Sequence, residues 1–176
     1  MDSASIDDEK QNWGDGPWLN EPDEVEIHVS PSTGYFRRAK RNPHTGTWCG
    51  YVIVPNGHPA FGKHYARLTR DLDGAVHGGI TFSAEVKGPD TGTVKGTRYW
   101  GFGFDCAHHA DLMPRHAYSL ALLSSVAEDS PPLRESLDRL AETQTYRTLE
   151  FVMDNICALD DALHAIEVSR NTGGAQ

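Results

Sequence analysis

Histidine is the residue type that points most directly to chemistry in this sequence. The apolar, glycine-rich run from Trp100 to Phe104 is typical of a buried strand, and it leads directly into Asp105 and His108. A carboxylate and an imidazole at the end of a buried strand lose hydration unless they pair, bind a metal or open onto a cleft. We therefore expect Asp105 and His108 to act as catalytic residues, although the same pair could be structural and cap the next segment.

His77 is the third catalytic candidate. It lies at the start of a segment, 76–83, that is expected to pair with 97–104 as a hairpin. The start of one arm of an antiparallel pair lies beside the end of the other arm. This predicts that His77 lies near Asp105 and His108, although a histidine there could also simply brace the hairpin.

Two glycines, Gly78 and Gly79, follow His77 directly. Backbone N–H groups that no side chain obstructs are suited to hold an oxyanion or a phosphate. We therefore expect these two residues to bind the anionic part of a ligand or cofactor.

A divalent metal ion is the cofactor that these residue types could share. His58 follows the strand-like run 48–54, and Asp111 completes a D-x-x-H-x-x-D spacing after the buried strand. If the strand ends meet, they bring together imidazole and carboxylate ligands suited to Zn²⁺ or Mn²⁺. The expected ligand set is His58, His77, Asp105, His108 and Asp111. No class of metal site requires this spacing, so a plain turn at His58 and a cap at Asp111 remain alternatives.

Other catalytic groups are less favoured. Side chains of neighbouring residues in an extended segment point in opposite directions, so Cys106 faces the core if Asp105 faces a cleft. The sequence contains no G-x-S-x-G, Walker A or G-x-G-x-x-G motif. Its three cysteines include no C-x-x-C pair, and their odd number argues against a disulfide framework.

Charge is concentrated at the N-terminus. The formal net charge is −9, and residues 1–26 hold nine acidic residues and one lysine, so the rest of the chain is close to neutral. A near-neutral body offers no basic face to duplex nucleic acid or to an anionic membrane. The sequence has neither an apolar run long enough to span a bilayer nor the features of a signal peptide, which predicts a cytoplasmic protein.

The elements that must position these residues are strands first and helices later. The chain of 176 residues is short enough for one domain. Alternating apolar residues and turn residues predict strands at 25–29, 35–41, 48–54, 76–83 and 97–104. Helices are expected at 115–127, after Ser130, and at 145–168. This order favours an α+β fold, with a mostly antiparallel sheet of about five strands (residues 25–104) packed against C-terminal helices.

Three segments are expected along the chain. Residues 1–24 form an acidic, partly disordered N-terminal segment, in which Gly16-Pro17-Trp18 docks on the body and the first dozen residues stay loose. Residues 25–170 form the single α+β domain, and residues 171–176 form a frayed tail.

Four short motifs together resemble those of a group of small phage and bacterial proteins of unknown activity. They are W-C-G-Y-V at 48–52, G-H-P at 57–59, V-H-G-G-x-T at 76–81 and G-F-D-x-A-H at 103–108, and the likeness resumes at 146–152. The resemblance implies that His58, His77, Asp105 and His108 belong to a shared pattern, and it supplies no mechanism. Where the group reads Ala-His-x-Gly-Asp, this chain has Ala110 before Asp111.

Two functions from different classes fit these residues. The first is a small hydrolase, with or without a metal, that acts on a phosphate-bearing or nucleotide-like small molecule through the His/Asp cluster. The second is a non-catalytic phage-type binder that captures a nucleotide signal by aromatic stacking, or a host protein through the acidic N-terminal segment. The aromatic candidates for stacking are Trp48, Tyr51, Tyr99 and Trp100. A third interpretation leaves the His/Asp set purely structural.

Overall fold

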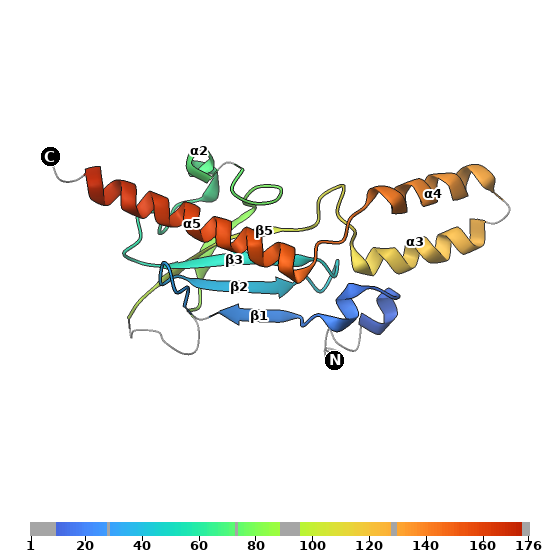
Figure 1. Ribbon diagram of the computed structural model, residues 1–176, viewed down its shortest axis with the longest axis horizontal. Helices are drawn as coiled ribbons and strands as arrows, with labels where there is room; N and C mark the ends of the chain where they lie inside the picture. The colour runs from blue at the N-terminus through green and yellow to red at the C-terminus, as the bar shows by residue number, and fades with distance from the viewer. Residues whose placement is uncertain (1–9, 28, 73, 89–95, 128–129, 174–176) are drawn as a thin grey trace.

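The fold is a five-stranded antiparallel sheet with a long helix across one face (Figure 1). The computed structural model describes residues 10–27, 29–72, 74–88, 96–127 and 130–173. In the sheet order β1-β2-β3-β5-β4, the strands are β1 (Glu24–Ile27), β2 (Phe36–Arg41), β3 (Trp48–Pro55), β5 (Tyr99–Asp105) and β4 (Phe82–Val86). The α-helices are α2 (Thr69–Leu72), α3 (Pro114–Val126), α4 (Pro131–Thr143) and α5 (Leu149–Gly173). The predicted α+β class is confirmed.

Helix α5 packs on the sheet through one apolar stripe. The buried residues of this stripe recur at spacings of three and four, as Val152, Ile156, Leu159 and Leu163. They share one core with the alternate residues of β3 and β5 that point toward the helix, among them Val52 and Phe102. A Cβ at Gly50 would come within 2.9 Å of Ile156 Cγ1, so the missing side chain allows the helix to approach β3 closely.

The opposite face of the sheet, which we call the far face, carries the other alternate residues. Phe36, Ile53 and Tyr99 form a small apolar cluster there. On the same face, Arg38 Nε lies 2.8 Å and Lys40 Nζ lies 3.4 Å from the carboxylate of Glu24.

The N-terminal segment belongs to the packed fold from residue 10 onward. Two short 3-10 helices, η1 (Gln11–Trp13) and η2 (Pro17–Asn20), bury Trp13 and Trp18 to 2% and 3% exposure. Lys10 is also buried, and its Nζ lies 2.5 Å from Asp23 Oδ1. Trp18 is therefore docked on the body, and packing begins before the end of the segment expected to be loose. Residues 1–9 lie outside the described part of the chain.

Two boundaries differ from those expected. Residues 76–79 form a turn instead of starting a strand, because Gly78 and Gly79 both adopt positive φ values of 66° and 83°. Hydrogen bonding to β5 begins at Thr81, whose N–H donates to Gly103 O at 2.9 Å. Helix α5 continues to Gly173, through part of the predicted frayed tail, and residues 174–176 lie outside the described part.

Candidate functional site

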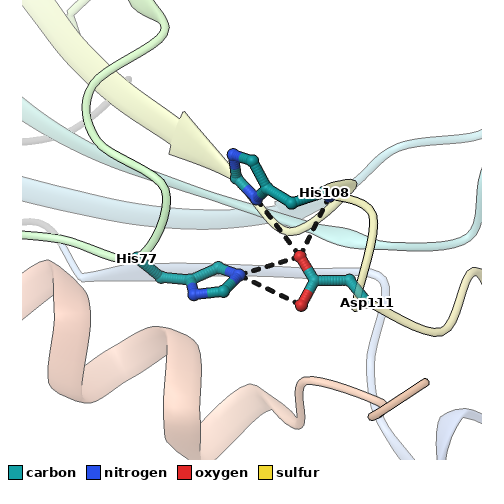
Figure 2. Close-up of side chains that lie close together, drawn as sticks. All are labelled: His77, His108 and Asp111. Atoms are coloured by element: carbon teal, nitrogen blue, oxygen red, sulfur yellow. Dashed lines mark hydrogen bonds and ion pairs between the residues drawn. The ribbon is translucent and has the colours of Figure 1, made fainter. Parts of the chain in front are cut away.

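Three side chains from two loops meet beyond the end of β5. His77 Nε2 lies 2.8 and 3.0 Å from the two carboxylate oxygens of Asp111, and His108 Nδ1 lies 3.2 Å from Asp111 Oδ2. Figure 2 shows both imidazoles directed at this one carboxylate. One ligand atom from each residue lies within 4.8 Å of the other two. We call these three residues the His/Asp site.

Asp111 is the centre of the His/Asp site and has no exposed surface (0%). Backbone hydrogen bonds fix it on both sides, because the N–H of Leu112 donates to Thr145 O and the N–H of Thr145 donates to Ala110 O, each at 2.9 Å. The N–H of His108 also donates to Asp111 Oδ2 at 3.0 Å. The carboxylate is therefore held in place by the backbone as well as by the two imidazoles.

Helix α5 orients His77. The backbone N–H of His77 donates to Asn155 Oδ1 at 2.7 Å, and its ring packs edge-on against Phe151 with 5.3 Å between ring centres. The rings of His77 and His108 are perpendicular and 4.9 Å apart. Their side chains are 20% and 34% exposed, so solvent or a small ligand can reach both imidazoles.

Arg147 is a fourth member of this region that the sequence reasoning missed. Its Nε donates to Asp111 Oδ1 at 2.8 Å, and its guanidinium carbon lies 4.8 Å from the centre of the Phe151 ring. The side chain is 24% exposed. The signal that could have found it is its position within 146–152, the second stretch of the resemblance described above.

The carboxyl group of Asp111 stays ionised down to strongly acidic pH. Burial by itself raises its pKa, but the hydrogen bonds from His77, Arg147 and the His108 amide outweigh burial and lower the pKa from 3.8 to about 2. The site thus contains a fixed negative charge in contact with two imidazoles and a guanidinium.

Gly78 allows His108 to approach the 76–79 turn. A Cβ at Gly78 would lie 2.0 Å from Cε1 and Nε2 of His108, and the φ of 66° also disfavours any side chain. The N–H of Gly79 donates to Val76 O at 3.1 Å inside the turn. This amide is therefore committed to the turn and is not free to hold an anion, contrary to the expectation for Gly79.

His58 does not join the His/Asp site. It is 4% exposed, its Nδ1 accepts the N–H of Ala60 at 3.0 Å, and its Nε2 lies 3.1 Å from Leu163 O. Its ring also packs edge-on against Tyr35. Burial lowers the pKa of His58, which favours the neutral imidazole that these two contacts need. The expected metal ligand is thus a buried residue that ties the turn after β3 to α5.

Asp105 also lies outside the His/Asp site. Its Oδ2 accepts the hydroxyl of Thr81 at 2.8 Å, and its Oδ1 accepts the N–H of Ala107 at 3.1 Å. Side chains alternate along β5, and this alternation places Asp105 with Gly101 on the far face, away from α5. The predicted catalytic carboxylate therefore caps the turn after β5, and Asp111 is the carboxylate that meets His108.

Cys106 has the environment expected for a core residue. It is 1% exposed, and burial raises the pKa of its thiol to about 12, which disfavours the thiolate that a nucleophile needs. The aromatic residues expected to stack on a base fall into two groups: Trp48 and Tyr99 are buried, whereas Tyr51 and Trp100 are partly exposed.

Acidic residues of the N-terminal segment are engaged inside the protein. Glu21 accepts hydrogen bonds from four groups in distant segments: Arg41 Nη2, Trp48 Nε1, the Tyr146 hydroxyl and the Leu149 amide. Asp23 pairs with Arg41 as well. Glu21 and Asp23 therefore face inward, whereas Asp15 and Glu24 are exposed. Asp2, Asp7, Asp8 and Glu9 lie outside the described residues, so the acidic surface expected to meet a host protein stays a prediction.

The donor set of the His/Asp site fits a divalent cation of the zinc class. Two imidazole nitrogens and one carboxylate oxygen match the three protein ligands of many catalytic zinc sites. The nitrogen-to-oxygen separations of 2.8 and 3.2 Å are close to the roughly 3.3 Å between neighbouring ligand atoms around tetrahedral zinc. Arg147 and the His108 amide would then act as outer partners that fix the Asp111 carboxylate.

Comparisons with known proteins leave the site to be interpreted from its own geometry. No protein-family model matches the chain, and no curated protein or solved structure is significantly similar to it. Within the part of the chain that the structure describes, no helix has both the length and the apolar character needed to cross a bilayer.

Proposed function

We propose that this protein is a divalent-metal-dependent hydrolase of phosphate-bearing small molecules, with His77, His108 and Asp111 as the metal ligands. The observation that carries the proposal is the convergence of three ligand atoms within 4.8 Å around a fully buried carboxylate. Both imidazoles remain partly exposed, which leaves the site open to water and to a small substrate.

The proposed reaction is the cleavage of a phosphoester P–O bond by water. His77, His108 and Asp111 would hold the divalent ion, which would act as a Lewis acid and lower the pKa of a water molecule. The water oxygen would bond to phosphorus as the ester P–O bond breaks, and one water proton would pass to the leaving oxygen, which gives a phosphate and an alcohol. Asp111 would offset the charge of the cation, and its carboxylate, which contacts both imidazoles and accepts the His108 N–H, orients the two histidines.

Arg147 supports phosphate as the group that is recognised. Its Nε is fixed on Asp111 and its guanidinium packs on the Phe151 ring, so the side chain is held in one orientation while it stays 24% exposed. Guanidinium groups bind phosphate oxygens through paired N–H donors. We assign Arg147 to contact the substrate phosphate next to the metal.

Metal-dependent turnover of generic phosphoesters tests the proposal. Full-length protein is stripped with a chelator, reloaded with Zn²⁺ or Mn²⁺, and assayed on p-nitrophenyl phosphate, a monoester, and on bis-p-nitrophenyl phosphate, a diester. We expect turnover that requires the metal, falls to background in His108→Ala, and is retained in His109→Ala, which changes the neighbouring exposed histidine. A folded His108→Ala protein with full activity, or an absence of metal-dependent turnover on every ester, contradicts the proposal.

A nucleotide-capturing binder is the second candidate, and one observation favours it. The far face contains a hollow of about 190 Å³ lined by apolar and basic residues, namely Arg38, Lys40, Tyr51, Ile53, Phe82, Val86 and Gly101. A cavity of about 150 Å³ is known to hold a benzene ring, so a base is of suitable size. Incubation with a nucleotide pool separates the two candidates. Release of an unchanged nucleotide on heating supports capture, and conversion of the nucleotide supports the hydrolase.

A further inference from the structure

Helices α3 and α4 form a hairpin that extends beyond the end of the sheet, away from most of α5 (Figure 1). Its base is anchored to the body, where the N–H of Arg115 donates to Thr45 O at 3.2 Å and Trp13 packs near Pro114. Beyond the base the two helices pack mainly on each other, and α4 contains no buried residue. Ala127, at the end of α3, is buried. We call residues 114–143 the hairpin.

The hairpin exposes a concentration of large apolar side chains. Of the eight large hydrophobic residues exposed in the described part of the chain, four belong to it: Leu122 at 54%, Leu123 at 52%, Val126 at 73% and Leu133 at 48%. The three in α3 share one side of that helix with Ser119, because spacings of three, four and seven residues bring side chains together. Leu120, on another side of α3, lines a cavity with Leu140 of α4.

Two features of the hairpin indicate that it is incomplete by itself. Helices of 13 residues are marginal in water unless they pack through an apolar face, and here one face of α3 packs on nothing in the described part of the chain. A cavity of about 280 Å³ also remains between the helices near their base, lined by Met113, His116, Ser119, Leu120, Leu140 and Gln144. Apolar surface and unfilled space thus lie at opposite ends of the hairpin.

We propose that two copies of this chain pair through their hairpins as an antiparallel, two-fold symmetric four-helix bundle. In this arrangement the apolar tip of each hairpin, with Val126 and Leu133, lies against the cavity at the base of the other hairpin. A two-fold axis requires a surface that is complementary to itself. Here the same contact, between the tip of one hairpin and the base of the other, occurs twice. Four helices packed in this way form a common and stable bundle.

The charges of α4 favour a second copy over a partner of one charge sign. Its charged side chains include both signs within three turns: Arg134, Glu135, Asp138, Arg139 and Glu142. Glu135 and Arg139 already pair within α4 at 2.8 Å, and a two-fold axis at the middle of α4 would also place Glu135 of one copy opposite Arg139 of the other. A nucleic acid or an anionic membrane would require an excess of basic residues that α4 does not have.

The mass of the full-length protein in solution tests this pairing. Light scattering coupled to size exclusion should give twice the mass of one chain over a wide concentration range. The double variant Leu122→Glu/Val126→Glu should be monomeric, while Val168→Glu, which changes an exposed residue of α5 (46%), should stay dimeric. The combined fluorescence of the four tryptophans, of which Trp13, Trp18 and Trp48 are buried in the body, reports that each variant remains folded. A wild-type protein that is monomeric at every concentration, or a double variant that stays dimeric, overturns the proposal.

Disulfide crosslinking tests the antiparallel orientation. The double variant His116→Cys/Val126→Cys places one thiol near the base of α3 and one at its tip. These positions are ten residues apart on one helix, which is too far for a disulfide within one chain. Mild oxidation should therefore link two chains in the double variant and in neither single variant. Crosslinking of a single variant to itself would overturn the antiparallel arrangement.

Discussion

Two carboxylates near the start of α5, Glu21 and Asp111, have similar partners but different proposed roles, and their side chains are 15% and 0% exposed. Two consecutive residues of the chain bind them: the Tyr146 hydroxyl donates to Glu21, and Arg147 Nε donates to Asp111. In both cases burial raises the pKa of the carboxyl group, and hydrogen bonds outweigh burial so that the pKa is lowered. Both are therefore ionised acceptors that connect distant parts of the chain.

The difference between the two carboxylates lies in their partners. Glu21 is bound by Arg41, Trp48, Tyr146 and the Leu149 amide, groups that keep their protons at neutral pH. Asp111 is bound by two partly exposed imidazoles, whose ring nitrogens are common metal ligands. The partners of Glu21 include no imidazole, so we assign Glu21 to stability and keep Asp111 for the proposed metal site.

Replacing Glu21 should cause the largest loss of stability. Glu21→Ala leaves the fully buried guanidinium of Arg41 (0% exposed) without one of its carboxylates, and breaking such a pair costs about 4 kcal/mol of unfolding free energy. Urea denaturation at neutral pH measures this loss. The matched control, Glu85→Ala, removes an exposed ion pair with Arg98 and should leave the unfolding free energy nearly unchanged. Equal losses in the two variants would remove the structural role given to Glu21.

Replacing Asp111 should cost less stability and abolish metal binding. Asp111→Asn leaves Arg147 without a carboxylate, but that side chain is 24% exposed and can be hydrated, so we expect a loss of about 2–3 kcal/mol. Zn²⁺ affinity, measured by calorimetry on the folded variant, should fall to background because an amide is a poor ligand for zinc. The comparison with Glu21 fails if Asp111→Asn keeps its affinity for Zn²⁺.

Acid should reveal the contribution of Asp111 directly. A carboxyl group whose pKa is lowered on folding adds stability above its unfolded pKa, and this contribution is lost as the pH falls through the folded value. For Asp111 the window runs from 3.8 down to about 2, and the shift corresponds to about 2 kcal/mol. Unfolding free energies measured across this window should fall less steeply in Asp111→Asn than in the wild type. Parallel curves would contradict the role of these hydrogen bonds.

The smallest expected effect is a difference in Zn²⁺ affinity between variants of two neighbouring glycines, Gly78 and Gly79. Gly78→Ala and Gly79→Ala both place a side chain at positive φ, so each should cost about 1–2 kcal/mol. A Cβ at Gly78 meets His108 at 2.0 Å, whereas a Cβ at Gly79 meets nothing within 4 Å. Gly78→Ala should therefore also weaken Zn²⁺ binding, and Gly79→Ala should leave it unchanged. Calorimetry on both variants checks this contrast, and equal affinities would show that His108 does not depend on Gly78.

The fold was more predictable from the sequence than the site. Alternating and helical periodicities located β1, β2, β3, β5 and α5 because each pattern depends on neighbouring residues, whereas the strand predicted at 76–83 shares only residues 82 and 83 with β4. The antiparallel pairing of the two segments also predicted that His77 and His108 lie close together. The structure differs in detail, because the two glycines after His77 turn the chain before β4 begins. Elements whose formation depends on neighbouring residues could therefore be predicted from the sequence.

The remaining features of the site depend on the direction of side chains and on distant contacts. Asp105 and Asp111 flank His108 at equal spacing in the sequence, and only the alternation along β5 and the bridge to Thr145 select Asp111. His58 is directed into the core by its contact with Leu163, more than 100 residues away. For Arg147 the only signal is its position within 146–152 of the resemblance, and its neighbouring residues do not predict the contact with Asp111, which depends on where the chain enters α5.

Zn²⁺ binding to the wild-type protein and to its histidine variants tests the central claim most directly. Isothermal titration of the chelator-stripped protein should show one Zn²⁺ per chain. This binding should be lost in His77→Ala and in His108→Ala, and retained in His109→Ala. A wild-type protein that binds no Zn²⁺ or Mn²⁺, or one whose binding survives loss of both His77 and His108, would contradict the assignment of the His/Asp site as a metal centre.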